Sequence, residues 1–138
     1  MDMNEDQWCI ERREEVIEYL AKEGVKHGEV SEWPAWDVIP CTSAWAIESL
    51  VSPGWVGWWV VCGDHPTDYV SAKDIKEPRY VYEAIALRWQ EVCCFAKEGK
   101  EHPTVKINLD NPEKIEMLQS RSKMFFEWVS DDENWKYE

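Results

Sequence analysis

The sequence predicts an α+β fold: a small antiparallel sheet built on a central hairpin and packed by three helices. Two observations support this prediction. Three segments repeat apolar residues at helical spacing, and an apolar run that fits a buried strand lies between the first two of them. The chain has 138 residues, the common size of one domain. We therefore expect a single domain spanning residues 1–138.

The first helix is expected at about residues 5–23. Asn4 is a suitable N-cap because its side chain can accept from a free backbone N–H of the first turn, and Gly24 is a suitable stop. At 100° per residue, the apolar side chains of this segment share one broad arc, while glutamates occupy the other side. The pattern indicates a helix that covers a core with one face and meets solvent with the other.

Two further helices are expected nearer the C-terminus. The second is predicted at about residues 78–98, because Pro78 is favourable in a first turn and Gly99 lies just past the end. The third is predicted at about residues 112–129, where Asn111 precedes the apolar pattern and can cap it. Both segments carry an apolar stripe, so both are expected to pack against the rest of the fold.

The central hairpin is expected from strands at about residues 43–51 and 55–62. Ser, Pro and Gly at positions 52–54 form a good turn between them. The second strand is apolar on both parities, as in a strand that is buried on both faces, and Gly57 within it indicates a close backbone approach. The segment 104–109 also alternates apolar and polar residues, and the sequence leaves open whether it is a third, edge strand.

The charge of the chain excludes some classes of partner. There are 28 acidic and 15 basic residues, which gives a net charge of −13. Nucleic-acid binding requires clustered Lys and Arg, and anionic membrane surfaces would repel this chain, so neither is expected as a partner. The ordinary interpretation of such a charge is solubility. The alternative is a surface that receives a protein partner, in particular a basic one.

The remaining composition favours a cytoplasmic protein without a cofactor. The first residues, MDMNEDQW, have neither the basic nor the apolar region of a signal peptide, and no apolar run is long enough to span a membrane. Five cysteines lack a Cys-x-x-Cys pair, and the three histidines stand far apart. Neither a disulfide framework nor a metal site is therefore expected.

Ten tryptophans are more than packing alone requires in a chain of this size. Trp33 and Trp36 flank Pro34, which stiffens the segment that carries them. Two rings on such a loop could form a wall for a flat or cationic ligand. They could equally close the open side of the sheet as part of the core. Both residues are retained as candidates for ligand or partner binding.

A second candidate group follows the predicted central hairpin. Asp64, His65, Asp68 and Tyr69 lie in a stretch that we expect to be a turn-rich loop leaving a buried strand. A histidine close to two carboxylates could act as a general base with an orienting partner. The alternative is a purely structural turn, since Asp64 and Asp68 suit side chain–backbone turn hydrogen bonds and Pro66 fixes the backbone.

Six blocks, together rich in tryptophan, lie between residues 4 and 69: Asn4–Cys9, Glu32–Trp36, Trp45–Ser49, Pro53–Trp59, Gly63-Asp64 and Pro66–Tyr69. These blocks resemble a family of uncharacterised bacterial proteins, domain of unknown function 4826. The resemblance implies a bacterial, single-domain protein and transfers no activity, substrate or site residue.

The sequence thus favours a binding module for a protein partner over an enzyme. Gly-rich phosphate loops, a nucleophile elbow and a His-Glu-x-x-His motif are all lacking, and no catalytic residue is identified. The alternative is a small-ligand-binding protein or hydrolytic enzyme with a Trp-walled pocket near Asp64, His65 and Asp68. That alternative requires these side chains to converge on one cavity.

Overall fold

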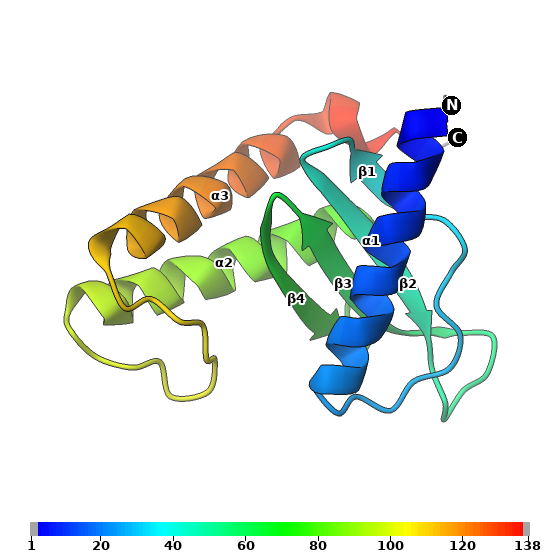
Figure 1. The fold of residues 1–138 in the computed structure, drawn as a ribbon, viewed down its shortest axis with the longest axis horizontal. Coiled ribbons are helices and arrows are strands. Elements are labelled where there is room, and N and C mark those ends of the chain that lie inside the picture. The colour runs from blue at the N-terminus through cyan, green and yellow to red at the C-terminus, as the bar shows by residue number, and fades with distance from the viewer. Residues whose placement is uncertain (1–2, 137–138) are drawn as a thin grey trace. The chain divides into compact units, whose positions relative to one another are not determined.

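The computed structural model describes residues 3–136 and divides into two compact units, the first ending at Val81 and the second beginning at Tyr82. The first unit contains α1 (Met3–Lys22) and a four-stranded antiparallel sheet, and the second contains most of α2 (Pro78–Lys97) and all of α3 (Pro112–Ser130) (Figure 1). The fold is α+β, as predicted, and the three expected helices are all present. The single-domain organisation stays a prediction.

The sheet is a meander in which strands adjacent in sequence are adjacent in space. Its order is β1-β2-β3-β4, and every neighbouring pair is antiparallel. The expected central hairpin is the β2–β3 pair. The bounds of the four strands are β1 Trp36–Val38, β2 Thr42–Glu48, β3 Val56–Gly63 and β4 His65–Ser71.

The turn-rich loop that we expected after β3 is a strand instead. The chain reverses at Asp64 and continues as β4, which pairs with β3. Gly63 makes this reversal possible: its φ is +153°, and an added Cβ would collide with the backbone of Cys41 and Thr42. Pro66 suggested a loop, but proline is tolerated in an edge strand beside a bulge, and the register shifts between Val61 and Gly63.

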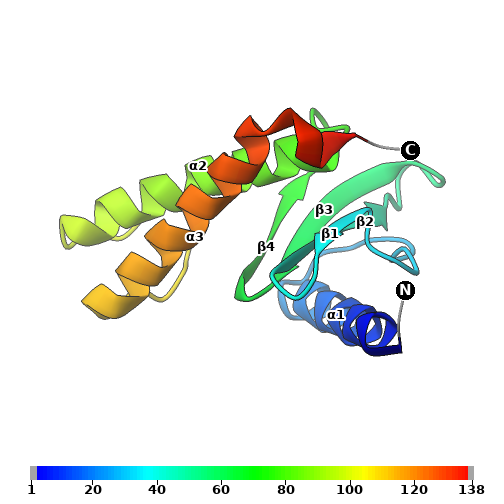
Figure 2. The same ribbon diagram turned by 90° about the horizontal axis from the view of Figure 1, so that it is seen from above.

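One face of the sheet packs against α1, as Figure 2 shows. The core between them contains Val16 and Leu20 from the helix, with Trp45, Ile47 and Val60 from the central strands. All five side chains are completely buried, because the apolar arc of α1 meets alternate residues of β2 and β3. This packing fixes the central hairpin on a rigid support.

The segment before β1 covers the outer side of β2. Gly28 N–H donates to the Glu48 carbonyl, and Ser31 N–H donates to the Ala46 carbonyl. The Arg13 guanidinium on α1 donates to the carbonyl oxygens of Val30 and Ser31 over 3.0 Å each. Arg13, which lies within the apolar arc of its helix, therefore ties this segment to α1 through backbone carbonyls.

The second unit is a helix pair held by aromatic side chains. α2 and α3 lie side by side (Figures 1 and 2), and Tyr82 of α2 meets Phe125 of α3 edge-on at 4.8 Å between ring centroids. The buried Ser122 hydroxyl donates to the Ala86 carbonyl over 2.9 Å. Asn111 caps α3 by accepting from Lys114 N–H, as its position predicted. The segment 104–109 is irregular and forms no strand.

Candidate functional site

The two candidate tryptophans differ in their surroundings. Trp33 lies in the segment before β1 and is 43% exposed. Trp36 is the first residue of β1, is half-buried, and stands opposite Ala44 of β2. Trp36 therefore belongs to the sheet, whereas Trp33 reaches solvent.

His65 forms a clasp at the start of β4. Its Nε2 lies 2.8 Å from the Thr42 hydroxyl, and its Nδ1 lies 2.8 Å from the Pro66 carbonyl. A carbonyl only accepts, so Nδ1 carries the proton in the neutral ring and Nε2 accepts from Thr42. The two side chains meet because Gly63, which stands opposite both residues, has no side chain to separate them.

This hydroxyl–imidazole pair has the hydrogen bond of a nucleophile and its base. Thr42 is completely buried, however, so its hydroxyl is closed to a substrate in this conformation. Asp64, one residue away in the turn, is exposed. The pair is therefore best understood as holding the start of β4 against β2.

Asp68 and Tyr69 lie on opposite faces of β4. Asp68 is 8% exposed and stands opposite Val61, and its Oδ1 accepts from Tyr69 N–H over 2.8 Å. Tyr69 stands opposite Val60, on the α1 face, where its ring contacts Tyr19 at 5.8 Å and Trp58 at 5.7 Å edge-on. The structure thus brings Tyr69 to an aromatic cluster rather than to His65.

The tip of the β2–β3 hairpin carries an apolar surface that the candidate residues do not include. Four of its side chains are exposed: Val51 by 93%, Trp55 by 73%, Leu50 by 57% and Val56 by 41%. Exposed apolar side chains are ordinary when they are scattered, but a concentration of four on one turn is not. We refer to residues 49–56 as the hairpin tip.

Hydrogen bonds hold the backbone of the hairpin tip in one conformation. The Ser49 hydroxyl accepts from Val51 N–H over 3.2 Å and from Ser52 N–H over 3.1 Å. Ser49 N–H donates to the Trp55 carbonyl over 2.8 Å, which closes the turn. Gly54 has a φ of +88°, a conformation that other residues rarely adopt. The tip is therefore an ordered turn with its apolar side chains directed outward.

The side chain of Glu48, at the end of β2, accepts hydrogen bonds that stabilise the same turn. Its Oε2 accepts from Gly54 N–H over 2.9 Å, and its Oε1 accepts from Glu29 N–H over 3.1 Å. These two backbone donors lower the pKa of the Glu48 carboxyl. Both partners of this carboxylate are therefore backbone amides rather than cationic side chains.

A shallow hollow of about 330 Å³ lies beside the hairpin tip. Two lysines and three serines contribute to its lining, and no carboxylate does, although the chain as a whole has a net charge of −13. The lining residues are Ser49, Ser52, Trp55, Val56, Gly57, Ser71, Ala72, Lys73 and Lys76. The tip therefore combines an apolar projection with a locally basic, hydroxyl-rich margin.

Sequence reasoning missed this surface because it treated positions 52–54 only as a turn. A signal was present: two apolar residues precede Ser-Pro-Gly and two follow it. Hairpin turns are usually polar, so apolar flanks on both sides of a turn indicate a projecting apolar surface. Their exposure could not be predicted, because the same residues would suit buried strand ends.

Other kinds of site are less well supported. Among residues 3–136, no group of His, Cys, Asp and Glu side chains is arranged to hold a metal ion, and no helix is both long and apolar enough to cross a membrane. Burial raises the pKa of the Cys62 thiol to about 11 and also raises the pKa of Cys9 and Cys93. These three thiols stay protonated at neutral pH and are poor nucleophiles.

The fold and this site define a small α+β protein with an ordered, apolar hairpin tip. The chain belongs to the family described as a domain of unknown function (DUF4826), which matches residues 2–135. No curated protein and no solved structure matches it.

Proposed function

We propose that the protein is a binding module that contacts a protein partner through the hairpin tip. The observation that supports this proposal is the exposure of four apolar side chains on a turn that is fixed by hydrogen bonds. Contiguous exposed apolar surface is typical of interaction sites, and a large aromatic side chain such as Trp55 is a frequent anchor of binding energy.

The order of the tip favours binding over an incidental exposure. A flexible loop loses conformational entropy when a partner immobilises it, and this loss weakens association. Here Ser49 and Glu48 already hold the backbone. Gly57, whose added Cβ would meet the Ser49 Cα at 2.8 Å, lets the two strands approach closely below the turn. The partner would therefore meet a preformed surface.

The charge of the protein supports a partner with a basic surface. A net charge of −13 attracts such a partner at long range and speeds its association. The hollow with Lys73 and Lys76 is a local exception. It favours a carboxylate of the partner at this one point, next to the apolar contact with Trp55.

The alternative, a hydrolytic enzyme that uses Asp64, His65 and Asp68, has less support. His65 is hydrogen-bonded to a completely buried hydroxyl, and Asp64 is exposed in the turn. Trp33 is the candidate from the sequence that is best placed to join a binding surface, because its ring is substantially exposed.

The proposal is tested by site-specific photo-crosslinking in extracts of the source cells. A photoreactive phenylalanine derivative replaces Trp55 in one protein, Trp33 in a second and the exposed Leu87 of α2 in a third. The expected result is a protein adduct that forms from position 55 and not from position 87. An adduct from position 33 alone would instead support the loop candidate from the sequence.

Competition supplies the control for this experiment. Unlabelled wild-type protein is expected to suppress the adduct at position 55, and a Val51→Ser/Trp55→Ala double variant is not. If the double variant competes as well as the wild type, the hairpin tip is not the contact surface and the proposal fails.

A further inference from the structure

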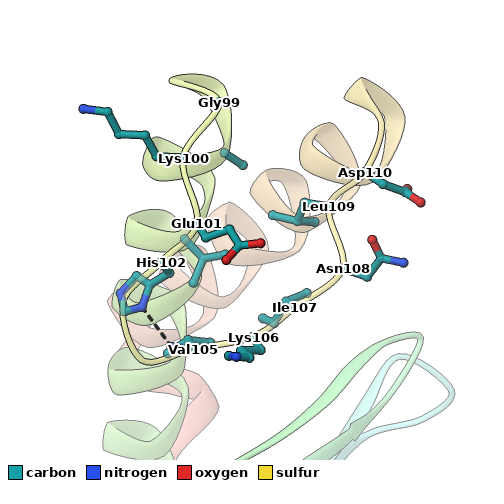
Figure 3. Close-up of a pocket in the computed structure, with 12 residues that line it drawn as sticks. Gly99, Lys100, Glu101, His102, Val105, Lys106, Ile107, Asn108, Leu109 and Asp110 are labelled. Atoms are coloured by element: carbon teal, nitrogen blue, oxygen red, sulfur yellow. Dashed lines mark hydrogen bonds between the residues drawn. The ribbon is translucent and has the colours of Figure 1, made fainter.

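A second hollow, larger than the one beside the hairpin tip, lies within the second unit. Its volume is about 610 Å³, within the usual range of sites for small molecules. It lies between the end of α2 and the segment 99–110 that leads to α3, as Figure 3 shows.

The loop that borders this hollow is anchored at both ends. The His102 side chain is only 7% exposed. Its Nδ1 accepts from Val105 N–H over 2.9 Å, as Figure 3 shows. Its Nε2 lies 2.7 Å from Glu91 Oε1. The ring also meets Phe95 edge-on at 5.2 Å. At the other end, Asn111 caps α3. A loop with these hydrogen bonds at both ends can hold the lining residues of a ligand site in one arrangement.

The lining of the hollow is apolar along one side. Val105, Ile107 and Leu109 are all half-buried, and Val92 and Ala96 of α2 complete this side. The segment 104–109, whose alternation suggested a strand, is instead an irregular loop that borders the hollow, with its apolar residues half-buried and its polar residues exposed at the margin.

Some charged residues of the hollow form ion pairs within the second unit, and others do not. Lys100 pairs with Glu98, and Asp110 pairs with Lys114, so both are compensated within the unit. Glu101 and Lys106 also line the hollow, but neither forms an ion pair or side-chain hydrogen bond with any residue of the chain between 3 and 136. One free carboxylate and one free ammonium group therefore border the same apolar surface.

We propose that this hollow binds a small zwitterion with an apolar body, the chemistry of an apolar amino acid or a short apolar peptide with free ends. Glu101 accepts hydrogen bonds from the ligand ammonium group, and Lys106 donates to the ligand carboxylate. The apolar side chain of the ligand lies against Ile107, Leu109 and Val92. This inference does not depend on the hairpin tip, which belongs to the first unit.

The test compares ligands that differ only at their ends, by isothermal titration calorimetry. L-leucine and L-leucyl-L-leucine are titrated beside their N-acetylated and amidated derivatives. We expect at least one of the two zwitterions to bind with a dissociation constant of about 1 mM or lower. Removing either ligand charge should weaken binding roughly tenfold or more, because a charge-assisted hydrogen bond is lost.

Variants assign each ligand charge to a residue. In Glu101→Gln, the zwitterion and its N-acetyl derivative should bind equally weakly; in Lys106→Met, the zwitterion and its amide should do so. Glu116→Gln and Lys123→Met, on exposed positions of α3, are matched controls that should bind as the wild type does. Lack of binding by both zwitterions to the folded wild type would overturn the proposal, as would binding that both site variants leave unchanged.

Discussion

At the scale of single residues, two carboxylates have pKa values displaced in opposite directions by their surroundings. Glu48 receives two backbone N–H groups, which favour its ionised form. Asp37 of β1 stands opposite Ser43, on the face that meets α1, where burial and the nearby Glu5 carboxylate disfavour ionisation. The same type of group therefore stabilises the fold in one place and opposes it in another.

Replacing Glu48 by Gln is expected to lower the melting temperature at neutral pH, because an amide oxygen can accept only one of the two N–H groups well. The lowered pKa of Glu48 contributes stability above the ordinary glutamate pKa of about 4.3, and this contribution is lost as the pH falls further. The melting-temperature difference between wild type and Glu48→Gln should thus shrink on acidification. A difference that is constant with pH would contradict this explanation.

The opposite change in melting temperature is expected for Asp37→Asn. The raised pKa of Asp37 means that the folded state prefers the protonated carboxyl, so stability is lost as the pH rises through that pKa. The uncharged variant should melt at a higher temperature than the wild type at pH 7, and the two should converge in acid. Thermal unfolding at several pH values measures this, and equal melting temperatures at pH 7 would show that ionised Asp37 is tolerated.

At the scale of elements, the central hairpin is a rigid strand pair that ends in an exposed tip. Gly57 shows how closely the two strands approach: an added Cβ would lie 2.8 Å from the Ser49 Cα, at the point where the register shifts. Truncating the apolar side chains of the tip above it would remove little packing, since these side chains face solvent. Stability and the proposed binding are therefore expected to be separable within one hairpin.

Gly57→Ala is expected to destabilise the protein by about 1 to 3 kcal/mol, the usual cost of forcing an extra carbon into a packed site. Urea denaturation measures the change. Ser52→Ala, an exposed substitution in the same turn, is the matched control and should change stability little. If the two variants are equally stable, the strands have room to separate.

Removing the apolar side chains of the tip is expected to leave the fold intact. The Val51→Ser/Trp55→Ala variant should unfold within about 0.5 kcal/mol of the wild type, because both side chains are already in water. The same denaturation experiment checks this. A large loss of stability would mean that the tip packs against the protein, and its role as a contact surface would then be doubtful.

At the scale of the whole molecule, the acidic charge opposes compactness. The chain has 28 acidic and 15 basic residues, so repulsion among surface carboxylates destabilises the folded state. Exposed glutamates on α1, such as Glu14 and Glu18, contribute to this repulsion.

Adding salt should therefore raise the melting temperature as the screening length falls to roughly 8 Å near physiological ionic strength. Thermal unfolding over a salt series measures the effect. The increase should be smaller in Glu14→Gln/Glu18→Gln, which starts with less repulsion to screen. A melting temperature that is independent of salt would show that the negative charges are already compensated by their neighbours.

The sequence predicted the helices and the central hairpin because their signals are local. Apolar periodicity, Asn111 as a cap and the turn before Trp55 depend on neighbouring residues. The first part of β4 was predicted as a loop because its strand structure depends on a distant contact: Gly63 has to pass the backbone of Cys41 and Thr42 before the next residues can align with β3. The placement of the candidate residues also depends on strand register rather than on sequence proximity, and this register places Tyr69 apart from His65.

The exposure of Trp55 has a consequence for how the molecule can be observed. Its indole is 73% exposed, whereas Trp45 and Trp89 are completely buried. A soluble quencher that collides with surface indoles should reach Trp55 and spare the other two. Any partner that covers the hairpin tip would then protect part of the emission from quenching. The hairpin tip thus carries its own fluorophore, and any occupancy of the tip could be followed without attaching a label.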